Sequence, residues 1–458
     1  MSIVLFLSGC SLNDVMEKAS QKTYQAMKDK EDTGRRVIDD SPLKDGTITR
    51  AESGSGVIDE LRVGNNSSNH IDVYSTAGDL LETEISVIDA TNEEDSSDEI
   101  LASSLDNVDT NKGVNNFCYA YSMLNDSEKL AYREIFSILD DLLEDVILTS
   151  KDVDEIDKAF KSVMVDHPEI FYVKGYSIGK YMYGDTIDRI SLSGTYTLSK
   201  QEVADKKREI ENYITRVIDN APLRDDYSKI KYVYEYLVHN NVYLESSVNN
   251  QNILSVVENG ETVCQGYAKM TQLLLNRMGI FCTLVNGEAC GNNGVNTGKT
   301  LSNEWGAHVW NIVKCDGDYY NVDTTWGDAA FTLIDPDSSD APVIDINYEF
   351  LLVDDAALKG THRPKPVVDM PKCNSLLANY YVKEGAYFEN VNEEQLRNIF
   401  DRAYMTGQSP VYLKASNDMV YEELVDYLIR EQGIFDYISQ SNVKYVEYAE
   451  RRMMLVSL

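Results

Sequence analysis

Three short segments, far apart in the chain, carry residue types that could together form a thiol nucleophile. They are 262–268, 307–311 and 321–328, and they contain Cys264, His308 and Asp323. A free cysteine is only a few per cent thiolate at neutral pH, so it needs a neighbouring base to become a strong nucleophile. A histidine can take the proton, and a carboxylate can fix the histidine tautomer and stabilise the imidazolium. The chemistry available to such a set is attack on a carbonyl carbon.

The cysteine must be placed at a helix start for this chemistry. Residues 262–278 have the pattern of a helix, and Thr262 with Gln265 fits a Thr-x-x-Gln capping box. Cys264 then lies in the first turn, where unpaired N–H groups and the helix dipole favour a thiolate. A helix terminus stabilises a thiolate by only about 1 kcal/mol. This alone is too little to ionise the thiol at neutral pH, so a histidinium partner is also needed. Gly266 leaves the first turn open to a substrate backbone.

The histidine and the aspartate are predicted to share a hairpin. Residues 307–313 and 319–323 read as strands around Asp316-Gly317, a strong hairpin signal. A two-residue loop pairs Cys315 with Asp318, and further from the turn His308 faces Thr325. His308 and Asp323 are then diagonal neighbours on one face, about 7–8 Å apart at Cα. A slip of one residue would put them on opposite faces.

This constellation resembles the transglutaminase-like superfamily over residues 226–328. The shared motifs are Val-Cys-x-Gly-Tyr-Ala at 263–268, His-x-Trp-Asn at 308–311 and Val-Asp-x-Thr-Trp at 322–326. The resemblance implies an α+β fold with a papain-like core. It also implies Cys264 as nucleophile, His308 as general base and acid, and Asp323 as the group that orients the ring.

The resemblance further implies an aromatic oxyanion donor on a loop upstream of the cysteine. Tyr243 occupies that place, and the backbone N–H of Cys264 is the second expected donor. Losing one such donor typically costs about 2.7–4 kcal/mol. The alternative is that Tyr243 is one more surface tyrosine among 30.

The remaining candidates have simpler interpretations. Buried packing is expected for Cys282, Trp310, Trp326 and Asn311, and a cap or turn role for His167 and His239. The acidic segment 335–345 departs from the EF-hand pattern, because Asp340 replaces its glycine and Ile346 its final glutamate. We therefore expect no metal and no cofactor. A papain-type protease and an arylamine acetyltransferase are disfavoured, because Cys-Gly-x-Cys-Trp and Arg-Gly-Gly are absent.

Net charge limits the partners. Asp and Glu outnumber Lys and Arg by 76 to 42, which gives a formal net charge of −34. Such a surface repels phosphate backbones, so nucleic-acid binding is not expected. The same acidity argues against acidic substrates and favours basic or neutral ones, such as lysine-rich proteins or wall peptides.

The N-terminus resembles the end of a bacterial lipoprotein signal. Leu7-Ser8-Gly9-Cys10 follows an apolar run and looks like a lipobox, which implies lipidation of Cys10 and anchoring to a membrane. No Lys or Arg precedes Ile3, so we expect a start further upstream. The flanking regions look like envelope proteins of Gram-positive anaerobes, which implies an extracytoplasmic, lipid-anchored location.

Composition and patterning divide the chain into five parts. We expect a truncated signal at 1–10, a disordered acidic tether at 11–112, a helical N-terminal α+β region at 113–200, the catalytic core at 201–335, and an acidic loop with a small C-terminal α+β domain at 336–458. The first helix is predicted from 126 or 127 to about 146, and the C-terminal domain is predicted to begin with a strand at 380–388. Seven cysteines allow disulfides but demand none.

These features predict a cell-envelope thiol enzyme that attacks amide bonds of proteins or peptides through a Cys264 thioester. Resolution by water makes it a peptidase or amidase, and resolution by an amine makes it a protein-glutamine acyltransferase. The alternative is a catalytically idle domain that acts as an envelope binding or scaffold protein. The expected partners are a protein or peptide substrate and, through Cys10, a membrane; the oligomeric state stays open.

Overall fold

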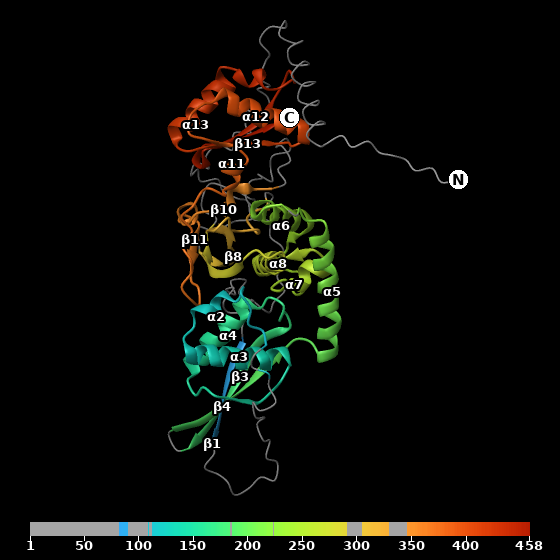
Figure 1. Cartoon of the computed structure of the whole chain (residues 1–458), viewed down its shortest axis with the longest axis vertical. Coiled ribbons are helices and arrows are strands. Elements are labelled where there is room, and N and C mark those ends of the chain that lie inside the picture. Colours follow the sequence, from blue (N-terminus) through green and yellow to red (C-terminus); the bar gives the residue numbers. More distant parts are fainter. Residues whose placement is uncertain are drawn as a thin grey trace, which may run out of the picture.

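The computed structural model describes residues 82–89, 109, 112–183, 186–222, 224–290, 305–328 and 346–458. Three blocks of structure follow one another along the long axis in chain order (Figure 1). The predicted signal with Cys10 and the acidic segment 335–345 lie outside the described residues, as does most of the predicted tether. One part of that tether is a strand instead, β1 (Glu82–Asp89), which pairs in parallel with β3.

The N-terminal block packs helices against a four-stranded sheet of order β1-β3-β4-β2. Its other elements are α2 (Tyr119–Met123), α3 (Asp126–Asp140), β2 (Val146–Leu148), α4 (Val153–Asp166), β3 (Val173–Tyr183) and β4 (Thr186–Tyr196). Helix α3 starts from an Asn125–Glu128 capping box and ends six residues before the predicted end at 146. The chain leaves the helix because Leu142 and Asp145 adopt positive φ angles, and Val146 then joins the sheet.

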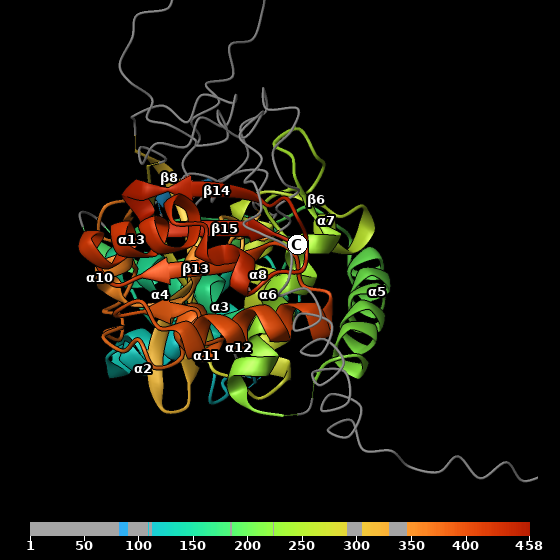
Figure 2. The same cartoon turned by 90° about the horizontal axis from the view of Figure 1, so that it is seen from above.

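The central block contains the residues that could do chemistry. Its helices are α5 (Lys200–Asp219), α6 (Asp226–Asn240), α7 (Ile253–Glu258), α8 (Cys264–Arg277) and α10 (Asp355–Leu358). Its strands are β5 (Val242–Tyr243), β6 (Glu261–Thr262), β7 (Cys282–Ala289), β8 (Gly306–Cys315), β9 (Asp318–Val322), β10 (Leu351–Val353) and β11 (His362–Pro364). Helix α5 runs along the outer flank (Figures 1 and 2).

The core sheet includes strands from beyond the predicted core boundary. Its order is β10-β9-β8-β7-β11, so both edge strands come from beyond residue 335. The predicted core boundary at 335 is therefore too early. The reason is physical: β9 and β7 each have an edge that needs hydrogen-bond partners, and β10 and β11 supply them.

The C-terminal block has a four-stranded sheet of order β12-β13-β15-β14. Its elements are α11 (Tyr380–Lys383), β12 (Tyr387–Phe388), α12 (Glu393–Thr406), β13 (Val411–Ala415), α13 (Asp418–Val425), β14 (Lys444–Tyr448) and β15 (Met453–Ser457). The predicted strand at 380–388 is wrong in its first half, because the Asn379 side chain caps a short helix there.

The C-terminal block is fixed to the core by buried contacts. The rings of Tyr348 and Tyr380 stack with centroids 3.7 Å apart. The Glu349 carboxylate pairs with Lys414 at 2.6 Å and with Arg451. No helix among the described residues is long and apolar enough to cross a lipid bilayer. The predicted α+β class is confirmed by these three mixed blocks.

Candidate active site

The predicted hairpin register is confirmed. Cys315 pairs with Asp318, and the ladder continues without a slip to Asn311 opposite Val322. Asp316 and Gly317 form the turn with φ angles of 51° and 99°, as an Asp-Gly loop requires. The ladder between β8 and β9 ends at the pair Asn311–Val322, so the predicted pairing of His308 with Thr325 is not formed. The Asp323 N–H donates instead to the Phe350 carbonyl at 3.0 Å. The aspartate side chain is thus held at the end of β9.

The Asp323 carboxylate is buried and accepts several hydrogen bonds. Its Oδ2 contacts His308 Nε2 at 2.7 Å and His362 Nε2 at 3.0 Å, and its Oδ1 accepts the Trp326 N–H at 3.2 Å. Burial alone would raise the pKa of Asp323, but the charge and hydrogen bond of His308 and the bond from His362 outweigh it. The pKa therefore lies below its ordinary range, and the group stays ionised at neutral pH.

His308 is turned so that Nε2 faces the carboxylate, which leaves Nδ1 for a second partner. Burial lowers the pKa of the ring, but the charge and hydrogen bond of Asp323 and the hydrogen bond and charge of Cys264 raise it to about 10. The imidazolium is therefore favoured at neutral pH beside the ionised Asp323 carboxylate.

Cys264 lies in the first turn of α8, as predicted, and is its first residue, but the predicted capping box is absent. The N-cap is Val263, which has no side-chain cap bond. The Thr262 hydroxyl accepts from Ser255 Oγ at 2.7 Å and donates to the Asn250 carbonyl at 3.0 Å. It is therefore committed to the loop that precedes α8. Cys264 keeps its place in the first turn, where the residue is 7% exposed.

Two polar contacts fix α8 against the strands that carry His308 and Asp323. Asn311 Nδ2 of β8 donates to the Ala268 carbonyl of α8 at 3.0 Å. Thr271 Oγ1 of α8 lies 2.9 Å from Thr324 Oγ1, next to Asp323. Since one contact joins α8 to the strand of His308 and the other joins it to the residue after Asp323, they hold the segments that carry the three groups together.

Tyr243 lies beside the start of α8. Its strand β5 pairs in parallel with β6, and Tyr243 is opposite Thr262, two residues before Cys264. Burial raises the pKa of Tyr243, and the nearby Cys264 and Glu245 raise it further. The phenol therefore keeps its proton and can act as a hydrogen-bond donor near the thiol.

His362 joins the site although sequence reasoning missed it. It is opposite Ala289 across β11 and β7, and its Nδ1 lies 2.8 Å from Thr361 Oγ1. Burial lowers the pKa of His362 and outweighs the effect of Asp323. A neutral ring with its Nε2 proton toward Asp323 follows, and the Thr361 hydroxyl then donates to Nδ1. No motif around residue 362 signals this position, which depends on β11 joining β7.

Aromatic rings enclose the two histidines and the carboxylate. The ring centroid of Trp310 lies 6.2 Å from that of His308 and 5.0 Å from that of His362. Trp326 packs against both histidines, at 5.9 Å and 4.7 Å. Gly287 of β7 leaves room for this, since a Cβ there would meet the Trp310 ring at 2.8 Å. The packing roles predicted for Trp310 and Trp326 are confirmed.

The same cluster is the set among the described residues that could hold a metal ion. The ligand atoms of His308, Asp323 and His362 lie within 4.8 Å of one another. Both imidazoles already reach Asp323 Oδ2 at hydrogen-bond distance, so the three groups satisfy one another without an ion. The three side chains thus form a hydrogen-bonded cluster.

The other candidates named from sequence have structural roles. Cys282 is fully buried in the core, and His167 caps the end of α4 with Nδ1 2.7 Å from Glu169 Oε1. His239 lies in the last turn of α6. The six described cysteines are free of disulfides: Cys118, Cys264, Cys282, Cys290, Cys315 and Cys373.

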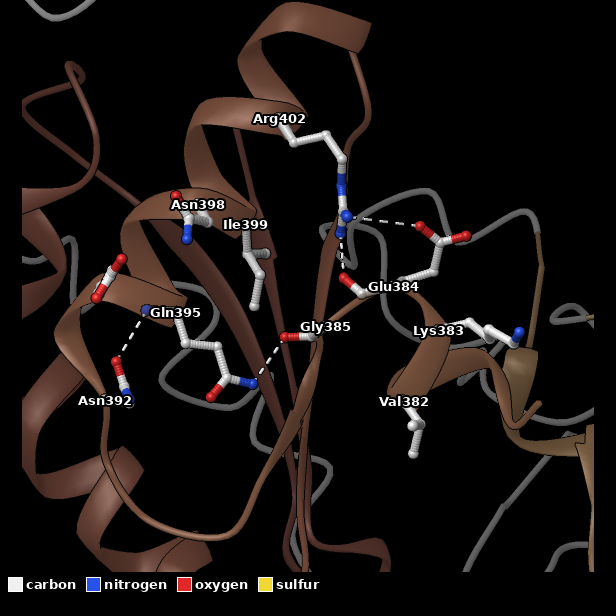
Figure 3. Close-up of a pocket in the computed structure, with 10 residues that line it drawn as sticks. Val382, Lys383, Glu384, Gly385, Asn392, Gln395, Asn398, Ile399 and Arg402 are labelled. Carbon is white, nitrogen blue, oxygen red and sulfur yellow. Dashed lines mark hydrogen bonds and ion pairs between the residues drawn. The ribbon is translucent and has the colours of Figure 1, made fainter. Parts of the chain in front are cut away.

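A cavity of about 400 Å³ lies in the C-terminal block between α11 and α12 (Figure 3). Its polar groups are largely paired with each other. Arg402 reaches the Glu384 carboxylate, and the Gln395 side chain donates to the Gly385 carbonyl at 2.7 Å. Its lining residues include no cysteine and no histidine.

Comparison with known proteins agrees with the location of this site. The family model described as the transglutaminase-like superfamily matches residues 215–324. The kyphoscoliosis peptidases of Mus musculus and Homo sapiens are each 35% identical over 72 residues, which is 16% of this chain. The match covers 11% of each of those two proteins, so the chain corresponds to about a tenth of their length.

Two solved structures that this chain resembles share little sequence identity with it. A structure described as a TGase is 11% identical, with 37% of this chain and 55% of that chain covered and a TM-score of 0.23. A candidate cysteine protease of Cytophaga hutchinsonii is 14% identical, with 32% of this chain and 61% of that chain covered and a TM-score of 0.20. These likenesses add nothing to the assignment of individual residues.

Proposed function

We propose that this chain, which carries a transglutaminase-like domain with a papain-like fold, is a thiol enzyme that attacks amide carbonyls through Cys264. The observation that carries the proposal is the position of His308. Its Nε2 lies 2.7 Å from Asp323 Oδ2, and its strand β8 is hydrogen-bonded through Asn311 to α8, the helix that begins with Cys264. A buried ring between a carboxylate and a thiol is suited to take and return one proton.

In the first step, the Cys264 sulfur attacks the carbonyl carbon of an amide. The carbon–nitrogen bond breaks, and His308 gives its proton to the leaving amine, so that a thioester on Cys264 and a free amine result. In the second step, water or another amine attacks the thioester. His308 takes a proton from the attacking group, and the thiolate leaves. Asp323 keeps the ring oriented in both steps.

Tyr243 is proposed as a donor to the oxyanion that forms in each step. Its strand is paired with β6 directly before α8, and its phenol stays protonated because its pKa is raised. The backbone N–H of Cys264 is the second proposed donor, since N–H groups in a first helical turn have no partner within the helix. Both donors belong to segments that are fixed by hydrogen bonds before substrate arrives.

Hydrolysis is the proposed outcome, with transfer to an amine as the alternative. The catalytic groups are the same for both, so they do not decide between water and an amine. The curated relatives are called peptidases, which favours hydrolysis. A quenched peptide library tests this choice when it is incubated with and without an added primary amine. Peptide cleavage supports a peptidase, and incorporation of the amine supports an acyltransferase.

The variants Cys264→Ala and His308→Ala control this experiment. Both should lose turnover, because one lacks the nucleophile and the other the proton carrier. Turnover that survives in either variant would contradict the proposal. A wild-type chain that binds peptides and never turns them over would favour a scaffold protein.

We also propose that the protein is anchored at the cell envelope through a lipid on Cys10. The support is the Leu7-Ser8-Gly9-Cys10 sequence alone. Metabolic labelling with an alkyne fatty acid should label the wild-type chain and leave Cys10→Ser unlabelled. Equal labelling of both would exclude Cys10 as the modified residue.

A further inference from the structure

A cavity of about 660 Å³ lies between the N-terminal block and the core, next to the first turn of α8. Its walls come from α4, from the loop and strand that follow α4, from β7, and from residues 365–367. On α8 it is lined by Gln265, which follows Cys264 directly, and by Lys269, one turn further on. A volume of this size accommodates a short peptide segment.

The cavity is basic although the chain is strongly acidic. Five lysines line it, with Asp157 as the carboxylate among its lining residues: Lys158, Lys161, Lys174, Lys269 and Lys365. The whole chain has a formal net charge of −34. A concentration of positive charge beside the proposed nucleophile is therefore a local feature that overall composition does not predict, and it favours an anionic ligand.

Lysines on the rim of the cavity already have acidic partners. Lys158 pairs with Glu128 at 2.8 Å, Lys161 with Asp157 at 2.7 Å, and Lys365 with Glu288. These pairs lie partly in solvent and leave little net charge for a ligand. These three lysines therefore contribute little to the attraction for an anion.

Lys269 differs from these rim lysines in its partners. Its Nζ donates to the Gln251 carbonyl at 3.1 Å, and within the described part of the chain it has no ion pair. Burial lowers the pKa of Lys269 to about 8, although the nearby Cys264 acts to raise it. An incoming carboxylate would stabilise this ammonium group and fill the place of the missing counter-ion.

The rest of the lining is apolar and suits the body of a peptide side chain. Phe171 and Met164 contribute from the N-terminal block, and Leu284 and Val367 from the core. A ligand with a carboxylate and an apolar neighbour would match both parts of the wall.

We propose that this cavity is the substrate subsite of the enzyme and binds a carboxylate of an acidic peptide, with Lys269 as the residue that recognises it. This inference rests on the proposed function, since it places the subsite one residue from the nucleophile. It opposes the expectation from net charge that substrates are basic or neutral. The carboxylate belongs either to an Asp or Glu side chain or to the C-terminus of a peptide.

The test measures binding in Cys264→Ala protein, where no turnover occurs. Two pairs of fluorescent peptides are compared by anisotropy. One pair differs only by Glu against Gln inside the peptide, and the other only by a free against an amidated C-terminus. In at least one pair the acid should bind about tenfold more tightly than its amide, as a charge-assisted hydrogen bond predicts. The pair that shows the difference identifies the source of the carboxylate.

The Lys269→Met change should remove that preference, so that acid and amide bind within about twofold of each other. The matched control is Lys444→Met, which removes the same charge from an exposed position on β14. It should keep the full preference. If Lys269→Met does not fold, Lys269→Gln replaces it and should likewise bring acid and amide binding within about twofold of each other.

Equal binding of acid and amide in both pairs would overturn the inference, and so would a preference that survives in the folded Lys269 variant. Turnover of peptides by the wild-type chain is measured alongside. Turnover without any acid preference would refute the proposed subsite and would still support the proposed thiol enzyme. Acid-specific binding through Lys269 without turnover would refute the proposed enzymatic function, and the cavity would then not be a substrate subsite.

Discussion

Replacing Asp323 by asparagine should change both the charge and the hydrogen bonding around His308. Asp323 accepts from two imidazoles at Oδ2 and from the Trp326 N–H at Oδ1. An asparagine has one acceptor oxygen, so one side of its amide must face a donor. The oxygen is expected to face the histidines, because the 3.2 Å contact to Trp326 is the longest of the three.

The magnitude follows from the pKa of His308. Its displacement from 6.5 to about 10 corresponds to on the order of 4–5 kcal/mol in favour of the charged ring. Because the pKa is raised on folding, this stabilisation is fully present below pH 6.5 and is lost as the pH rises through about 10. Loss of the carboxylate charge should lower the pKa of His308 by about 1–3 units.

The assay combines a pH profile with a direct titration. In the wild type, kcat/KM should decline on the alkaline side only well above neutral pH, and in Asp323→Asn this decline should begin at least about one pH unit lower. The rate itself should fall by between about 10² and 10⁴. Carbon-13 labelling of the five histidines allows the His308 resonance to be followed, with His308→Gln for assignment.

Two results would refute this reasoning. One is a wild-type His308 that titrates near its ordinary pKa, which would mean that the carboxylate does not hold the charged ring. The other is an Asp323→Asn variant whose alkaline limb coincides with that of the wild type.

Three further perturbations test other parts of the site. Tyr243→Phe should lower kcat by one to three decades with little change in KM, because it removes an oxyanion donor; an unchanged kcat in steady-state assays would exclude that role. His362→Phe should lower kcat about tenfold, since the Asp323 carboxylate loses a donor that holds it in place; a kcat identical to the wild type would leave His362 a packing residue. Gly287→Ala should destabilise the protein by about 1–3 kcal/mol in denaturant unfolding, because its Cβ would lie 2.3 Å from the Arg363 carbonyl oxygen, whereas Gly306→Ala, which has open space around it, should not.

Short-range sequence patterns predicted the helix and the hairpin that carry the candidate catalytic residues. The Asp316-Gly317 turn fixed the register of β8 and β9 as far as Asn311 and Val322, and His308 and Asp323, predicted to be neighbours, lie 2.7 Å apart at Nε2 and Oδ2. Helix α8 was predicted to within two residues at its start, with Cys264 in the first turn. These features depend on residues close together in the sequence, so periodicity and turn chemistry were sufficient.

Features that depend on distant pairing could not be predicted. His362 reaches Asp323 because β11 pairs with β7, more than seventy residues earlier in the chain. The basic cavity forms where the N-terminal block meets α8 and β7, and no single segment carries its charge pattern. The capping box failed for a related reason, since Thr262 bonds to Asn250 and Ser255 in the folded loop.

The central claim is that His308 activates the Cys264 thiol, and the rate of alkylation at pH 6 tests it most directly. Peptide mapping after brief exposure to iodoacetamide separates Cys264 from the fully buried Cys282, which serves as an internal control. The charged His308 ring should make Cys264 react far faster than Cys282, and His308→Ala should slow Cys264 at least about tenfold. A Cys264 that reacts no faster than Cys282, or at the same rate without His308, would contradict the account.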